Sequence, residues 1–332
     1  MLRLRRGTWF WLILLLTVFS GALYAASARQ VVIISLDGLR PDALHHARTP
    51  HLDALWQRGA YTWRAQTVLP SVTLVAHASM LSGVTPAKHG ITWNYWSPRR
   101  GYIRTPTVFQ VAVERGLDTA MFVAKKRLQH LVPPAFRQQG TKGTRVHFEH
   151  AGYTDRDVVE AVLAHWQKHQ PALTFIHLPD PDSAGHAHGW MSRRQLQTIA
   201  QTDAAVGTLV RALYQLGRVA QTVLIVTADH GGHGKRHGSN CPEDLTIPWI
   251  VWGMGVKRGY EIQRQVHIYD TAATAAWALG LPLPAEWEGK PVTEAWAGHP
   301  DAGHTPSTAI QPPLATPMQA TPLPPRCSHR WP

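Results

Sequence analysis

Cysteine and acidic side chains are both scarce in this chain of 332 residues. The two cysteines, Cys241 and Cys327, cannot form the paired Cys-x-x-Cys ligands of a cysteine-rich zinc module. Aspartate and glutamate number 21 against 33 lysines and arginines, and this imbalance favours anionic partners such as phosphate esters, nucleic acids or a membrane surface. The basic residues are scattered, with short clusters at Arg99–Arg100 and 125–127, so no specific nucleic-acid binding is expected. Internal repeats are also lacking, which excludes a solenoid.

The N-terminus has the composition of an export signal. Three arginines precede an apolar run over residues 9–26, and the small-residue pattern Ala26-Ser27-Ala28 follows. This order is typical of a secretory signal peptide over residues 1–28, and the alternative is an uncleaved anchor formed by residues 9–26. We predict an exported protein, periplasmic or secreted, with cleavage favoured over anchoring. A membrane contact is expected only if the segment is not cleaved.

Apolar strands alternate with amphipathic helices over residues 29–297. Strands are predicted at 31–36, 119–124, 145–149, 173–178, 223–226 and 247–252, and helices at 49–59, 74–81, 107–116, 155–169, 192–216 and 269–279. This alternation predicts an α/β fold, a three-layer α/β/α sandwich with a mainly parallel central sheet. Pro248 favours an edge position, or the start of its strand. We expect a small insert near 91–150 and a disordered tail over 298–332, which is rich in Pro and Thr.

Acidic residues follow three of the predicted strands: Asp37, Asp182 and Asp229. Each alone is better explained as a turn or loop residue. The carboxyl ends of parallel strands share one edge of a sheet, where open α/β sheets bind their ligands, so we expect the three carboxylates to meet there. Histidines lie nearby in the sequence: His186 on an apparent tight loop after Asp182, His230 beside Asp229, and His237 on a glycine-rich loop. Carboxylate oxygens and imidazole nitrogens are ligands that zinc takes, so a metal site is predicted.

A threonine at a helix start is the other candidate for chemistry. Thr73 precedes a helix predicted to begin at Leu74, and its local sequence favours a plain N-cap. The alternative is catalytic, because a helix N-terminus favours anions. A threonine hydroxyl held there beside a divalent cation can ionise and attack phosphorus.

Together these motifs resemble the alkaline phosphatase superfamily and, within it, the type I phosphodiesterase/nucleotide pyrophosphatase family. The resemblance spans about residues 31–279 and rests on six motifs in order: Asp37-Gly38, Pro70-x-x-Thr73-x-x-x-His77, Gly83-x-x-Pro86-x-x-His89-Gly90, Asp182-x-x-x-His186, Asp229-His230-Gly231 and His237-Gly238. It implies an alkaline phosphatase-like fold and an exported metal-dependent hydrolase of phosphoric esters, most of all a phosphodiesterase.

The resemblance also implies a ligand set for two divalent metal ions, with zinc expected. One ion would be held by Asp37, Asp229 and His230 and would touch the nucleophile Thr73, while the other would be held by Asp182, His186 and His237. Thr73 would form a covalent phosphothreonine, which water then hydrolyses. His77, in the same motif as Thr73, is predicted to help bind the substrate.

Two departures from the family concern the substrate. Where the family usually carries Pro-Asn before the histidine, this chain has Val75-Ala76, so the asparagine expected to bind the phosphoryl oxygen is missing. The run Ala124-Lys125-Lys126-Arg127-Leu128 is similar to one near the substrate site of phosphonoacetate hydrolases. Our hypothesis is that Lys125, with Arg127, supplies the positive charge that this asparagine does not. The alternative is a solvated basic loop.

Other functions remain open on the same residues. A phosphomonoesterase, a phosphonate hydrolase or an envelope phospho-headgroup transferase would use the same site, and a non-catalytic metal-binding exported protein would keep only the ligands. Sulfatase chemistry is excluded, because the Cys/Ser-x-Pro-x-Arg motif is not present at Thr73. The aromatic residues of 91–105 either stack on a substrate or pack the insert, and packing is favoured. The substrate alcohol and the oligomeric state are not predicted.

Overall fold

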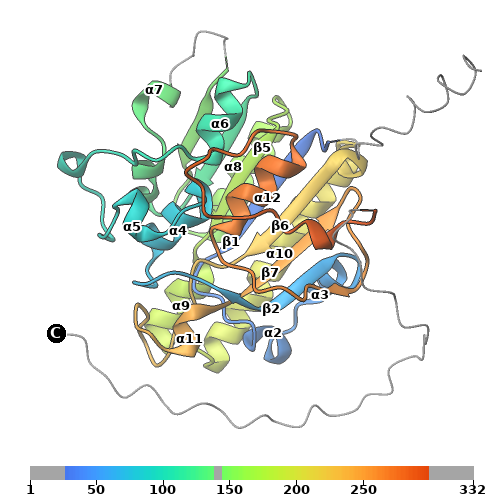
Figure 1. Ribbon diagram of the computed structural model, residues 1–332. Coiled ribbons are helices and arrows are strands. Elements are labelled where there is room, and N and C mark those ends of the chain that lie inside the picture. Colours follow the sequence, from blue (N-terminus) through green and yellow to red (C-terminus); the bar gives the residue numbers. More distant parts are fainter. Residues whose placement is uncertain (1–26, 138–143, 299–332) are drawn as a thin grey trace, which may run out of the picture.

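Eight strands form one sheet in the computed structural model, which describes residues 27–137 and 144–298 (Figure 1). The strands are β1 (Gln30–Leu36), β2 (Ala60–Gln66), β3 (Thr119–Val123), β4 (Val146–His150), β5 (Leu173–Leu178), β6 (Thr222–Thr227), β7 (Thr246–Gly253) and β8 (Tyr260–Glu261), in the order β4-β3-β5-β1-β6-β7-β2-β8. The five strands from β4 to β6 are parallel, whereas β7 runs antiparallel to both β6 and β2. The mainly parallel sheet predicted from the sequence is therefore confirmed.

Helices cover both faces of this sheet. One layer consists of α4 (Thr73–Ser82), α6 (Val108–Glu114) and α12 (Asp270–Ala278), which pack on one another. The other layer consists of α2 (Ala43–His46), α3 (Pro50–Gln57), α8 (Asp155–Trp166), α9 (Asp180–His188) and α10 (Arg193–Gln215). Shorter elements complete the described chain: α5 (Pro86–His89), α7 (Pro134–Arg137), α11 (Pro242–Leu245), η1 (Pro98–Arg100), η2 (Lys126–Leu131), η3 (Val219–Gln221) and η4 (Thr293–Ala295). The three predicted layers are thus present.

The centre of the sheet is the most apolar part of the fold. Strands β1, β5 and β6 are buried along their whole length, as expected for parallel strands with a helix layer on each face. Their registers match: Ser35 pairs with His177 of β5 and with Thr227 of β6. Because the three strands end level, the segments that follow them begin at one edge of the sheet.

Three strands differ from the sequence expectation, and the shortest of them, β8, consists of two residues only and was not predicted. Strand β2 was not predicted, because its buried positions hold the small residues Ala60, Thr62 and Ala65 while the aromatic Tyr61 and Trp63 face outward, partly exposed. Strand β7 lies inside the sheet, between β6 and β2, so the edge position suggested by Pro248 is wrong. Pro248 is the third residue of β7, which agrees with the other expectation, a proline near the strand's start.

The remaining domain predictions fall partly on undescribed residues. The signal peptide or anchor lies almost wholly within 1–26, and the tail within 299–332, both outside the described residues. Ala28 is already part of the fold, since it is buried and its N–H donates to the carbonyl of Ala278. Within the predicted insert 91–150, strands β3 and β4 belong to the main sheet. In the part of the chain that is described, no helix has the length and apolar character to span a bilayer.

Candidate active site

The predicted acids meet at the carboxyl edge of the sheet. Asp37 follows β1, Asp229 follows β6, and Asp182 lies on α9, directly after β5. Lys125, which follows β3, joins two of them: its Nζ lies 2.7 Å from Asp37 Oδ2 and 2.6 Å from Asp182 Oδ2. Asp229 Oδ1 accepts the backbone N–H of Gly38 at 3.1 Å, which ties the end of β6 to the end of β1. Four segments remote in sequence therefore form one cluster.

Thr73 adjoins this cluster. It is the first residue of α4, one position earlier than predicted, and the N-cap position is held by Val72. The N-cap interpretation is therefore wrong. The Thr73 hydroxyl instead accepts a hydrogen bond from Lys125 Nζ at 3.2 Å, which makes Lys125 a link between the threonine and the two carboxylates. A solvated basic loop does not describe Lys125, since its ammonium group is enclosed by these partners.

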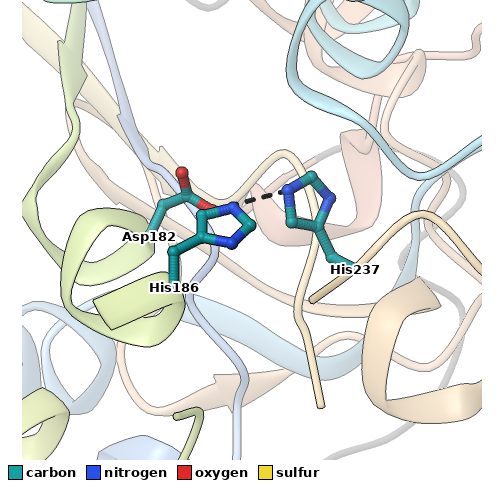
Figure 2. A group of neighbouring side chains, drawn as sticks. All are labelled: Asp182, His186 and His237. Atoms are coloured by element: carbon teal, nitrogen blue, oxygen red, sulfur yellow. Dashed lines mark ion pairs between the residues drawn. The ribbon is translucent and has the colours of Figure 1, made fainter. Parts of the chain in front are cut away.

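Asp182 and His186 lie on a helix and not on the tight loop expected from the sequence. Helix α9 begins at Asp180, so the two side chains are one turn apart on the same face. His186 Nε2 is 3.4 Å from Asp182 Oδ1, and His237 Nε2 is 3.7 Å from the same oxygen. Figure 2 shows His237 reaching the pair from a separate loop. The spacing of Asp182 and His186 thus has a simple cause, the helical repeat.

The three predicted histidine ligands share one orientation. Each ring bonds a backbone carbonyl through Nδ1: His186 to Lys235, His230 to Gly231, and His237 to Ser71, at 3.0, 2.8 and 2.9 Å. A carbonyl oxygen can only accept, so Nδ1 must carry the proton in each neutral ring. Nε2 is then left with a free lone pair directed at the carboxylates, which is the form of imidazole that binds metals.

The donor set fits divalent cations. Nine buried side-chain N and O atoms of the described residues have no hydrogen-bond partner, and four of them lie in this cluster: Asp37 Oδ1, Asp182 Oδ1, Asp229 Oδ2 and His230 Nε2. Buried polar atoms are rarely unpaired, and a bound ion is one reason for such exceptions. In the described chain, two groups have ligand atoms within 4.8 Å of one another: Asp182, His186 and His237, and Asp37, Asp182 and His230. Asp229 Oδ2 lies 3.4 Å from His230 Nε2, beside the second group.

Charges within the cluster are unbalanced, with three carboxylates around one ammonium group. Burial and the neighbouring charge of Asp37 raise the pKa of Asp229 to about 7. Burial acts in the same direction on Asp182, but His186 and Lys125 outweigh it and lower the pKa of that carboxyl to about 2. Burial would lower the pKa of Lys125, yet Asp37 and Asp182 raise it, so the ammonium stays charged. The surplus of negative charge is what an added cation would neutralise.

An asparagine missed in the sequence lies beside Thr73. Asn94 Oδ1 accepts the backbone N–H of Leu74 at 3.0 Å, so a side chain from a distant loop satisfies the first turn of α4. Arg127 holds this loop in place by donating to the Asn94 carbonyl at 2.8 Å. The family resemblance implied an asparagine at position 76, within the helix. The structure supplies an amide from position 94 instead, and no local sequence signal links it to the helix.

His77 lies behind Thr73, away from any surface. Its ring is fully buried; Nδ1 donates to the Thr73 carbonyl at 2.7 Å and Nε2 accepts from Ser35 Oγ at 2.8 Å. Both ring nitrogens are therefore engaged by protein groups. The predicted contact between His77 and a substrate has no free atom to make it in this arrangement.

The aromatic residues of the 91–105 loop mostly pack on one another. Trp93, Trp96 and Tyr102 surround the His130 ring, with centroid distances of 5.6, 4.5 and 6.2 Å. Tyr95 is the exception, since half of it is exposed and the Arg100 guanidinium lies 5.3 Å from its ring centroid. The packing interpretation accounts for three of these four aromatic residues.

A family model and several known proteins match this chain in sequence. The family model described as type I phosphodiesterase/nucleotide pyrophosphatase matches residues 31–235, which include every predicted site residue except His237. Human ectonucleotide pyrophosphatase/phosphodiesterase family member 7 is 23% identical over 221 residues, which cover 62% of this chain and 48% of the relative. Human GPI ethanolamine phosphate transferase 1 is 24% identical over 284 residues, 76% of this chain and 29% of the relative. The chain thus spans half or less of the length of these relatives.

The fold is shared with solved structures. An inactive variant of murine ectonucleotide pyrophosphatase/phosphodiesterase 5, in complex with AMP, superposes with a TM-score of 0.66 at 14% identity. The match covers 81% of this chain and 100% of the murine chain. At this identity the likeness supports the architecture, which is the alkaline phosphatase-like fold predicted from the sequence.

Proposed function

The chain belongs to the type I phosphodiesterase/nucleotide pyrophosphatase family, and from this we propose that it is an exported two-metal hydrolase of phosphoric esters, in the first place a phosphodiesterase or nucleotide pyrophosphatase. The observation that carries the proposal is the meeting of a threonine hydroxyl with four buried ligand atoms that have no protein partner. A buried carboxylate cluster without such a hydroxyl would suit a structural ion equally well.

The proposed ligands divide as the sequence motifs suggest. Asp182, His186 and His237 would hold one divalent cation. Asp37, Asp229 and His230 would hold the other, next to Thr73, since His230 Nε2 lies 3.5 Å from Asp37 Oδ1 and 3.4 Å from Asp229 Oδ2. The mixture of imidazole nitrogen and carboxylate oxygen suits zinc. When bound, the two cations supply positive charge that favours the ionised Thr73 oxygen and stabilises the phosphoryl oxygens.

Thr73 is the proposed nucleophile. Its oxygen attacks phosphorus, and the new Thr73 O–P bond forms as the bond to the ester oxygen breaks and the alcohol leaves. Water then cleaves the phosphothreonine, releases phosphate or its monoester, and restores the hydroxyl. The position at the first turn of α4 supports this role, since a helix N-terminus favours the binding of an anion. His77 would act indirectly, by fixing the Thr73 carbonyl from behind.

Lys125 and Asn94 are the proposed substrate contacts. Lys125 Nζ lies between Thr73 and two carboxylates, so its fixed charge would meet a phosphoryl oxygen arriving at Thr73. The side-chain oxygen of Asn94 accepts the backbone N–H of Leu74, which leaves the amide N–H groups of Asn94 to donate beside Thr73. Each would stabilise charge that develops on the phosphoryl oxygens during transfer. Arg127 would serve by holding Asn94.

Export is proposed from the N-terminal composition, with residues 1–28 as a signal peptide, 29–297 as the catalytic domain and 298–332 as a tail. A second candidate function is transfer of a phospho-headgroup to an alcohol. The match to a GPI ethanolamine phosphate transferase over 76% of this chain favours it, since an alcohol would replace water in the second step.

A substrate panel on the purified chain tests these proposals. We expect turnover of bis-p-nitrophenyl phosphate that a chelator removes and zinc restores, exceeding turnover of p-nitrophenyl phosphate, a phosphonate ester and p-nitrophenyl sulfate. Transfer is detected in the same assay by adding glycerol and measuring the glyceryl p-nitrophenyl phosphate formed. A folded, zinc-loaded sample that turns over no ester would replace the enzyme proposal with a metal-binding protein.

A further inference from the structure

His177 is a buried histidine beneath the site that no motif singled out. It lies on β5, five residues before Asp182, and its side chain has no exposed surface. Its Nε2 is 2.6 Å from Asp37 Oδ2, the shortest of the contacts made by the site histidines. Its Nδ1 faces the backbone N–H of Ala124, at 3.4 Å, and Ala124 immediately precedes Lys125. One ring therefore touches both Asp37 and the strand end that carries the lysine.

The proton on this ring is fixed by its partners. A backbone N–H can only donate, so Nδ1 of His177 must accept, and Nε2 must carry the hydrogen that it donates to Asp37. The other site histidines are the reverse: in His186, His230 and His237, Nδ1 donates to a carbonyl and Nε2 is free. The structure thus separates three imidazoles built to bind a cation from one built to hold a carboxylate.

The bond to His177 determines which oxygen of Asp37 faces the proposed cation. Asp37 Oδ2 is occupied twice, by His177 Nε2 at 2.6 Å and by Lys125 Nζ at 2.7 Å. Oδ1 has no hydrogen-bond partner and lies 3.5 Å from His230 Nε2. Rotation of the carboxylate would break both bonds to Oδ2. The ring consequently holds Oδ1 in the position of a ligand.

We propose that His177 is a positioning residue for the metal site, which orients Asp37 and sets its spacing from Lys125. The inference rests on the proposed function in one respect, that a divalent cation binds at Asp37. Groups that hydrogen-bond a ligand from outside the coordination shell typically change metal affinity by about 10- to 100-fold when removed.

Two substitutions separate the two bonds of the ring. In His177→Gln, the amide nitrogen reaches the place of Nε2, so the donor to Asp37 is kept while the acceptor for Ala124 is lost. In His177→Asn, the shorter amide keeps an acceptor for Ala124 but does not reach Asp37. His177→Phe removes both bonds at similar volume. Zinc affinity is measured by chelator competition on metal-free full-length protein, and thermal unfolding without metal reports the stability of each variant.

We expect His177→Asn and His177→Phe to bind zinc about 10- to 100-fold more weakly, and His177→Gln to remain close to the unsubstituted chain. Equal zinc affinity in His177→Asn and His177→Gln would overturn the inference, and this comparison holds even if His177→Phe does not fold. Failure of the unsubstituted chain to bind any divalent cation would overturn the proposed function together with this inference. Tight binding by the unsubstituted chain with no loss in the variants would overturn the inference alone.

Discussion

Histidines gather at both ends of the sheet, and the two clusters differ in what their rings do. The site cluster, His186, His230 and His237, lies at the carboxyl edge, where each Nε2 faces a carboxylate. The far cluster, His147, His165 and His169, lines a cavity of about 360 Å³ together with Asp118 and Arg145, at the amino ends of β3 and β4. The His165 ring stacks on His147 with centroids 4.3 Å apart, and it meets His169 in a tilted arrangement with centroids 4.5 Å apart.

Orientation is what separates the clusters. Rings stack in both clusters, with centroids 3.7 Å apart for His230 and His237 and 4.3 Å apart for His147 and His165. In the site cluster, however, a backbone carbonyl holds each Nδ1, whereas the His147 ring of the far cluster contacts the Glu149 carboxylate through Nε2. Within residues 27–137 and 144–298, no group of three converging ligand atoms includes a far-cluster histidine. The sequence has 20 histidines, and this number alone does not locate a metal site. The hydrogen-bond partner of Nδ1 is the better indicator, because it determines whether Nε2 is free to bind a metal.

The largest predicted difference between the two ends concerns turnover. Thr73→Ala removes the proposed nucleophile and should lower kcat for a diester by roughly 10⁴-fold or more, since loss of a covalent nucleophile leaves only binding and electrostatic catalysis. Thr73→Ser keeps a hydroxyl and should retain measurable turnover. His165→Gln, at the far cluster, should leave kcat unchanged. Steady-state kinetics on bis-p-nitrophenyl phosphate decide the matter; normal turnover in Thr73→Ala would show that another group attacks phosphorus.

The next effect is on bound metal. Asp182 belongs to both groups of converging ligand atoms. Asp182→Asn should therefore lower the metal content of the whole site, because each cation has few charged ligands and this substitution removes one of them. Asp118→Asn makes the same chemical change at the far cavity and should leave the metal content as it is. Elemental analysis after dialysis against a weak chelator measures both. If Asp118→Asn lost as much zinc as Asp182→Asn, the distinction between the clusters would be mistaken.

A smaller change is expected at Lys125. Lys125→Met removes the charge that lies between Thr73, Asp37 and Asp182, and should lower kcat/KM by about 100-fold, the scale found when one electrostatic donor is lost. The loss should be greater for a dianionic monoester than for a monoanionic diester, because the missing charge is positive. Lys126→Met, at the exposed neighbouring position, is the matched control. Equal kcat/KM values in the two variants would show that Lys125 does not contact the substrate and only stabilises the carboxylates around it.

Much of this arrangement could be predicted from the sequence because it follows from strand ends. Asp37 and Asp229 each come directly after an apolar run, and parallel strands bring such residues to one edge whatever the loops do. The predicted family is confirmed by the family model, and the predicted fold by the likeness to a solved structure. The site residues are brought together as expected, and their chemical roles stay predictions.

What could not be predicted depends on contacts between distant segments. Asn94 reaches the first turn of α4 across a loop whose path no spacing reveals. His177 is one residue of a buried strand, so its sequence context is that of the core, and only its contact with Asp37 distinguishes it. The N-cap assigned to Thr73 failed because α4 begins one residue earlier than the local sequence indicates, so that Val72 is the N-cap and Thr73 is already helical.

The smallest predicted effect is a pH dependence at the far cluster. Burial, followed by the charges of His147 and His169, lowers the pKa of His165 from 6.5 to about 4. Between these two values the unfolded chain binds more protons at this residue than the folded chain does, so the folded state loses stability as the pH falls from 6.5 towards 4 and keeps it in full above 6.5.

His165→Gln should make urea unfolding less dependent on pH in this window, while His46→Gln, which removes an exposed imidazole, should not. Because the far cluster takes no part in the proposed chemistry, kcat at neutral pH should be the same in both variants. An unfolding free energy that declines as steeply in His165→Gln as in the unsubstituted chain would show that the stacked rings accept protons without cost.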